Sequence, residues 1–178
     1  MRIIVSSKVN AENTVSYRET SFPDPNVEEW RGVTVFGEFQ SSGGLHPLAL
    51  ELLEKAREMA VESGDKAQLL LIGNGLVETA RKFYAQGADR VFVYDDPSLA
   101  AADADLYIRI MAHFIDNYKP AAILFPETEL GVLLQKRILD HAEANGNELK
   151  VQTTQEALSP GKAPDPAHLG ELVICEIP

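Results

Sequence analysis

Short β-rich runs alternate with helical segments along most of this chain, and this alternation constrains its fold more than any other feature. Val33–Phe36 is such a run, and the segment that begins at Pro47 and stops at Gly64 repeats apolar residues at helical spacing. The alternation continues to Thr153. Strands that alternate with helices of this length form a mostly parallel sheet with helices on both faces. We therefore expect an α/β, doubly wound fold with right-handed crossovers.

The same patterns place the individual elements and predict a five-stranded sheet. The expected strands are Val33–Phe36, Gln68–Ile72, Arg90–Tyr94, Ala121–Phe125 and Leu149–Thr153. After the helix that begins near Pro47, the expected helices are Leu76–Gln86, Ala104–Tyr118 and Leu130–Ala144. Together they define an α/β domain over residues 33–155.

The two ends of the chain lack this regularity. In residues 1–32, Arg2–Ser6 reads as a short strand and Lys8–Asn26 as an extended arm, which Trp30 would anchor to the domain. Residues 156–178 hold a proline-rich loop and a final strand, Glu171–Ile177. We expect this strand to lie antiparallel at an edge of the sheet, with Arg2–Ser6 as a candidate partner. The termini would thus add extra edge strands.

Composition excludes several classes of protein. The net charge of −11 disfavours binding to nucleic acid phosphates and anionic lipids. The single cysteine, Cys175, allows neither an intrachain disulfide nor a cysteine-held metal cluster, and its apolar neighbours suggest a core residue. No apolar run is long enough for a membrane span, and the N-terminus lacks a secretory apolar region. We therefore expect a cytoplasmic protein without a membrane span.

A candidate binding site lies where the winding of the sheet should reverse, between Val33–Phe36 and Ala121–Phe125. The small residues of the two loops that follow these strands could cradle a phosphate; they are Ser41, Ser42, Gly43, Gly44, Thr128 and Gly131. Alternatively, the glycines only make a turn and Thr128 caps a helix. The second reading is favoured because neither loop holds a lysine or arginine, whereas Glu127 and Glu129 would repel a phosphate.

Other chemical signals are weak, and no catalytic residue or metal site is predicted. Gly73-Asn74-Gly75 lacks the third glycine of a dinucleotide-binding motif and reads as a turn. Asp95-Asp96, followed by Pro97, suits a turn with helix-capping acids. Asp103 and Asp105 suit the N-terminus of the helix that begins at Ala104. The four histidines are scattered without metal-ligand spacing, and no serine lies in a nucleophile elbow.

Several segments resemble the alpha subunit of electron-transfer flavoproteins when taken together. They are Val35–Glu38, His46–Glu58, Tyr84–Val93, Asp95–Pro97 and Lys119–Phe125, whose order and spacing match the family over residues 33–150. The resemblance is to the N-terminal domain of that subunit, which does not bind the FAD. One difference concerns Gly131-Val132-Leu133, where the family usually has Gly-Arg-Asp.

The resemblance implies a nucleotide-binding-like fold of the adenine nucleotide alpha hydrolase-like type. It implies that the chain itself holds no cofactor, that FAD lies elsewhere in the complete complex, and that a beta-type partner subunit holds AMP. Because nothing follows Pro178, we expect the C-terminal FAD domain to be absent. By resemblance, a flavin dehydrogenase would be a further partner.

Two functions remain open at this point. The first is a scaffold or docking module of an electron-transfer complex, which is not itself an enzyme. The second is a small protein that binds AMP or ATP in the crevice at the reversal point. Under the first, the apolar groups of residues 9–30 and 159–178 would meet a beta-type subunit or a second copy of the chain, unless they fold back on their own domain.

Overall fold

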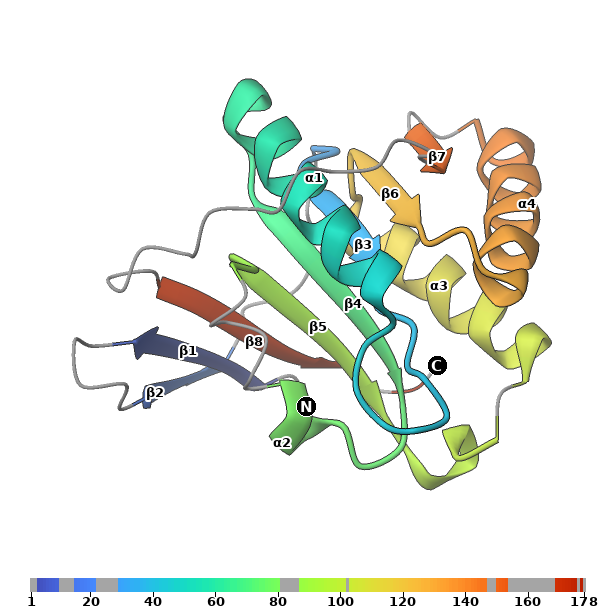
Figure 1. Cartoon of the computed structure of the whole chain (residues 1–178). Helices are drawn as coiled ribbons and strands as arrows, with labels where there is room; N and C mark the ends of the chain where they lie inside the picture. Colours follow the sequence, from blue (N-terminus) through green and yellow to red (C-terminus); the bar gives the residue numbers. More distant parts are fainter. Residues whose placement is uncertain are drawn as a thin grey trace.

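A computed structural model describes residues 3–9, 15–21, 29–80, 87–101, 103–146, 150–153, 169–175 and 177 of the chain. Its centre is a parallel sheet flanked by helices (Figure 1). The central strands are β3 (Val33–Phe36), β4 (Ala67–Gly73), β5 (Arg90–Asp95) and β6 (Ala122–Phe125). They lie in the order β5-β4-β3-β6, with every neighbouring pair parallel. The expected α/β class is confirmed.

Strands from both ends of the chain extend this centre. They are β1 (Ile3–Val9), β2 (Val15–Ser21), β7 (Lys150–Thr153) and β8 (Leu169–Cys175). The full order is β2-β1-β8-β5-β4-β3-β6-β7, so the described residues form eight strands and the count of five is not confirmed. The reversal between β3 and β6 lies where the alternation of elements predicted it.

The prediction for the last strand was wrong in its position. β8 lies inside the sheet, parallel to β5 on one side and antiparallel to β1 on the other. The expected pairing with the first strand does occur, but the C-terminal segment is not an edge strand. The predicted extended arm is also wrong in part, because β2 within it forms an antiparallel ladder with β1. Residues 154–168 lie outside the described residues.

In the part of the chain that the structure describes, four helices cover the sheet: α1 (Pro47–Ser63), α2 (Val77–Ala80), α3 (Ala104–Tyr118) and α4 (Glu129–Ala144). A short 3-10 turn, η2, spans Pro97–Leu99. The remainder of the predicted second helix, residues 81–86, lies outside the described residues. The predicted caps are confirmed: Gly64 ends α1 with a left-handed backbone, and the Asp103 carboxylate accepts from two N–H groups at the start of α3.

The core has two layers, one on each face of the sheet. Alternate residues of the strands, such as Leu69 and Leu71, pack with α1 and α2, whereas Leu70 and Ile72 pack with α3 and α4. This arrangement follows from the period of two in a strand, and it explains why β3, β4 and β6 are buried on both faces. Figure 1 shows α1 in front of the sheet and α4 at the end opposite β1 and β2.

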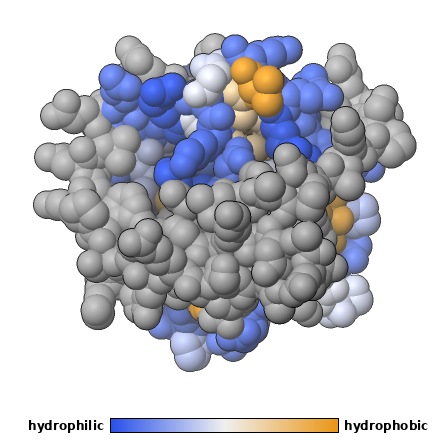
Figure 2. Space-filling view, turned by 90° about the vertical axis from the view of Figure 1, so that its left-hand side faces the viewer, coloured by the Kyte–Doolittle hydropathy of each residue, from blue (hydrophilic) through white to orange (hydrophobic). Residues whose placement is uncertain are grey.

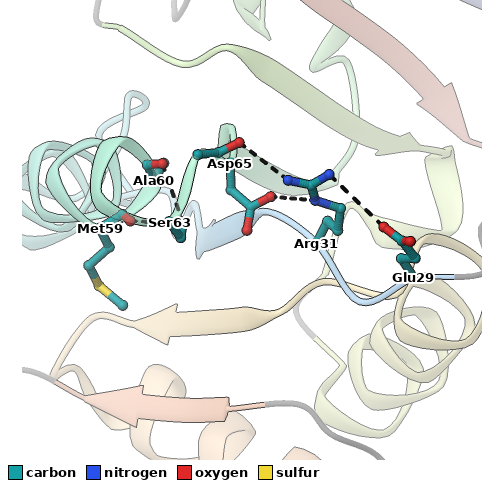
Figure 3. A network of polar contacts seen from close by, with 7 residues as sticks. Glu29, Arg31, Met59, Ala60, Ser63 and Asp65 are labelled. Atoms are coloured by element: carbon teal, nitrogen blue, oxygen red, sulfur yellow. Dashed lines mark hydrogen bonds and ion pairs between the residues drawn. The ribbon is translucent and has the colours of Figure 1, made fainter.

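A polar network ties the segment before β3 to the turn between α1 and β4 (Figure 3). The Arg31 guanidinium donates to the Asp65 carboxylate at 2.8 Å and to the Gly64 carbonyl at 3.4 Å, and Glu29 lies 4.0 Å away. Trp30 beside it is half-buried against the core, as expected of an anchor. The network lies where β3 and β4 begin, away from the loops that follow these strands.

Candidate functional site

The two predicted loops do meet at the reversal point, after β3 and β6. Glu38 follows β3 and Thr128 precedes α4, and the Thr128 hydroxyl donates a short hydrogen bond to the Glu38 carboxylate. The same hydroxyl accepts from the Gly131 N–H at 2.9 Å, which makes Thr128 the N-cap of α4. The Gly131 N–H in the first turn of α4 is therefore already satisfied by the chain itself.

The first loop is a compact exposed turn. Phe39 and Leu45 form an antiparallel bridge, and the Gln40 N–H donates to the Gly44 carbonyl at 2.9 Å. Ser41, Ser42, Gly43 and Gly44 lie at the tip of this turn and are exposed. The left-handed backbone of Gly43 and Gly44 is what the turn requires of them. The turn reading of the glycines is thus supported, whereas ligand binding by the tip remains a prediction.

Gly131 is the most tightly constrained position of the second loop. A Cβ atom placed there would lie 2.0 Å from the Pro126 carbonyl oxygen and 3.0 Å from the Thr128 Oγ1. Gly131 is also buried. Its role in the described structure is close packing of α4 against the end of β6.

Tyr107 on α3 lies near the junction of the two loops. Burial, and secondly the negative charge of Glu38, raise the pKa of the Tyr107 hydroxyl above its ordinary value of 10.0. Its ring packs against Phe36 at the end of β3, with centroids 6.4 Å apart. Tyr107 therefore stays protonated and neutral around pH 7 and adds no positive charge to the junction.

The neighbouring turn, Gly73-Asn74-Gly75, is filled by an acidic side chain. The Asp95 carboxylate at the end of β5 accepts from the N–H groups of Gly75, Leu76 and Val77 at 2.6, 2.8 and 3.1 Å. In dinucleotide-binding proteins, comparable N–H groups receive a phosphate. Here a carboxylate of the chain itself takes that place, and the turn reading of this motif is confirmed.

These contacts do not fit the phosphate of AMP, ATP or FAD. The Thr128 hydroxyl and the Gly131 N–H are used within the chain. The described side chains of residues 38–45 and 126–131 include Glu38, Glu127 and Glu129 but no lysine or arginine. Phosphate sites usually supply cationic or charge-assisted donors.

The remaining candidate groups serve structural contacts. His46 caps α1 by accepting a hydrogen bond from the Leu48 N–H at 3.2 Å. On α3, the Nδ1 atom of His113 lies 2.9 Å from the Tyr94 hydroxyl of β5. Cys175 is buried beside Tyr118, as expected of a core residue. Among the described residues, no group of three or more histidine, cysteine, aspartate or glutamate side chains is placed to hold a metal ion. Within the same residues, no helix has the length and apolar character needed to cross a membrane.

Residues 33–140, which include β3, the two loops and most of α4, match the family described as "Electron transfer flavoprotein domain". The chain belongs to this family. The predicted kinship with the N-terminal domain of the alpha subunit is confirmed by relatives of that kind. The electron transfer flavoprotein subunit alpha of Megasphaera elsdenii is 32% identical over 136 residues, which are 76% of this chain and 38% of that protein.

Two further relatives come from named enzyme complexes. The lactate dehydrogenase (NAD(+),ferredoxin) subunit LctC of Acetobacterium woodii is 37% identical over 61% of this chain and 26% of its own length. The acryloyl-CoA reductase electron transfer subunit beta of Anaerotignum propionicum is 32% identical over 62% of this chain and 30% of its own length. The matched part of this chain thus spans between 26% and 38% of the length of these three curated relatives.

The large exposed apolar side chains of the described residues do not lie at the two ends of the chain, where the sequence suggested a partner surface. Trp30 and Ile177 pack against the core of their own domain, which agrees with the alternative that apolar groups of the two ends fold back on it. The large apolar side chains that stay exposed among the described residues lie on helices instead; they are Val61, Val132, Leu133 and Leu139. The helical period contained this signal, because the buried face of α4 is already complete with Leu134, Ile138 and Ala142.

Proposed function

We propose that this chain acts as an alpha-type electron transfer flavoprotein domain that docks partners in an electron-transfer complex and does not catalyse a reaction itself. The match of residues 33–140 to the family carries the proposal. The names of the relatives, which include electron transfer subunits, support membership of such a complex. The cytoplasmic location expected from the sequence is part of the same proposal.

The geometry of the loop junction supports a role without a bound cofactor. Thr128, Gly131 and Glu38 satisfy one another, and Asp95 fills the adjoining turn. In this proposal the flavin is held by another part of the complex, and AMP, if present, by the beta-type subunit. The chain then contributes a rigid surface rather than reacting groups.

Co-expression with a beta-type electron transfer flavoprotein subunit tests the docking role. With an affinity tag on this chain, we expect the two proteins to elute together after a wash in moderate salt, because a docking module must retain its partner. The control is an unrelated acidic protein of similar size that carries the same affinity tag. Recovery of the tagged chain without the subunit would contradict the proposal.

A separate titration distinguishes docking from nucleotide binding. The purified chain should be colourless after desalting, and isothermal titration at low salt should show only weak binding of AMP or ATP. The reason is the acidic, internally bonded junction described above. A flavin absorbance band after desalting would contradict the expectation of a colourless chain. Submicromolar binding of AMP or ATP that is lost on changing Ser41–Gly44 or Thr128–Gly131 would favour the small nucleotide-binding protein instead.

A further inference from the structure

Two turns of the domain carry an asparagine that is followed by a glycine. They are Asn74-Gly75, between β4 and α2, and Asn145-Gly146, at the end of α4, and all four residues are exposed. The helices α2 and α4 pack on opposite faces of the sheet and lie far apart in Figure 1. On the side of the molecule seen in Figure 2, the described surface is mostly hydrophilic, as expected where turns meet solvent.

An asparagine before a glycine can lose its side-chain amide. The backbone nitrogen of the glycine gives up its proton to a base and attacks the Cγ atom of the asparagine. A bond forms between nitrogen and carbon, the Cγ–Nδ2 bond breaks, and ammonia leaves. Water then opens the succinimide ring to aspartate or isoaspartate, so the net reaction consumes water and releases ammonia. Glycine permits the attack because it has no Cβ atom and its backbone rotates freely.

The structure holds Asn145 out of this reaction. Its Nδ2 atom donates to the His141 carbonyl at 2.8 Å, and the Gly146 N–H donates to the Glu143 carbonyl at 3.2 Å. The amide carbon and the nitrogen that must meet are thus both engaged with the last turn of α4. Each of these hydrogen bonds has to break before the nitrogen attacks.

Asn74 differs because its side chain forms no hydrogen bond or ion pair with any residue that the structure describes. Its Cγ atom is therefore free to approach the Gly75 nitrogen. This nitrogen lies 2.6 Å from Oδ1 of Asp95, to which its N–H donates. A general base must lie within hydrogen-bond reach of the proton that it removes. The proton that Asp95 accepts is the one that has to leave, so the contact that holds the turn also supplies the base.

We propose that Asn74 is a site of spontaneous deamidation, with water as the co-reactant and the Asp95 carboxylate as the proton acceptor, and that Asn145 resists the reaction. The inference is independent of the docking function. Isoaspartate would lengthen the main chain before Gly75 by one carbon atom, and either product adds a negative charge close to Asp95. Modification should therefore loosen the turn between β4 and α2.

The test keeps the purified chain at neutral pH and follows both asparagines over time by peptide mapping and mass spectrometry, which detects the replacement of an amide by a carboxyl group. We expect conversion at Asn74 to be at least about ten-fold faster than at Asn145, because two hydrogen bonds must first break at Asn145. Asn145 is the matched control within the same molecule. A smaller difference, or faster conversion at Asn145, would overturn the choice of site.

The variant Asp95→Asn tests the base. Its side-chain oxygen can still accept from the Gly75 N–H, but an amide is a much weaker base than a carboxylate. Conversion at Asn74 should therefore slow several-fold, while an unchanged rate at Asn145 reports that the fold is retained. Asp95→Ser, which also lacks the carboxylate, is the second variant and should slow Asn74 in the same way. Unchanged or faster conversion at Asn74 in variants that retain the fold would overturn the role of Asp95.

Discussion

Replacing Gly131 with alanine should lower the free energy of unfolding by about 3 kcal/mol, because overpacking and loss of the cap act together. The added methyl group would lie 2.0 Å from the Pro126 carbonyl oxygen, so α4 must shift away from β6. In an exposed helix the same change would instead stabilise the protein by about 1 kcal/mol, since alanine is the better helix former. The two effects differ in sign, and the close backbone contact decides between them.

Urea unfolding of wild type, Gly131→Ala and Val132→Ala measures this effect. Val132 is the next residue of the same helix turn and is half exposed. Its truncation should change the free energy of unfolding by less than about 0.5 kcal/mol. A Gly131→Ala variant as stable as wild type, or more stable, would show that α4 does not pack against β6 as described.

Replacing Asp95 with alanine should lower the free energy of unfolding by about 2 kcal/mol, because three backbone N–H groups lose a charged acceptor. Leu76 is buried and Val77 half-buried, so water replaces this acceptor incompletely. The matched control is Asp96→Ala. The Asp96 carboxylate accepts from the exposed Ser98 N–H at the start of a short 3-10 turn, and its loss should lower the free energy of unfolding much less than the loss of Asp95.

Thermal or urea unfolding at neutral pH compares the two aspartates directly. If the variants were equally stable, the Asp95 carboxylate would not be the group that holds the turn between β4 and α2. That result would reopen this turn as a place for an external anion, which the present contacts disfavour.

The sequence predicted the central elements well because their signals are local. The bounds of β3 and α3 agree with the expected Val33–Phe36 and Ala104–Tyr118. A β-rich run ending in glycine marks the strand, and apolar periodicity with Asp103 as the cap marks the helix. The reversal between β3 and β6 also followed, since alternating elements leave few topologies.

The parts that were missed depend on pairing between distant segments. β8 lies between β5 and β1, although an edge position was expected. Its run Leu172–Cys175 is continuously apolar, a pattern typical of a strand inside a parallel sheet that is covered on both faces. β1 overlaps the predicted strand Arg2–Ser6, but β2 and its pairing with β1 were missed because the polar residues of β2 resemble those of a loop.

The candidate site was predicted in its location but only partly in its contacts. The cap formed by Thr128 could be predicted from its place before an apolar helix. The lack of a lysine or arginine in the two loops could be read from the sequence directly. The bond from Thr128 to Glu38 joins residues 90 positions apart and has no local signature. At the irregular ends of the chain, Trp30 and Ile177 pack against the core, whereas exposed apolar residues lie on α4.

The central claim is that this domain functions through a protein partner. Light scattering in line with size-exclusion chromatography tests it most directly, with this 19.5 kDa chain and a beta-type electron transfer flavoprotein subunit purified separately and then mixed. We predict a new particle whose mass equals one copy of each protein and which persists on dilution to low micromolar concentration. Two peaks that keep the masses of the separate proteins at every concentration would contradict the account.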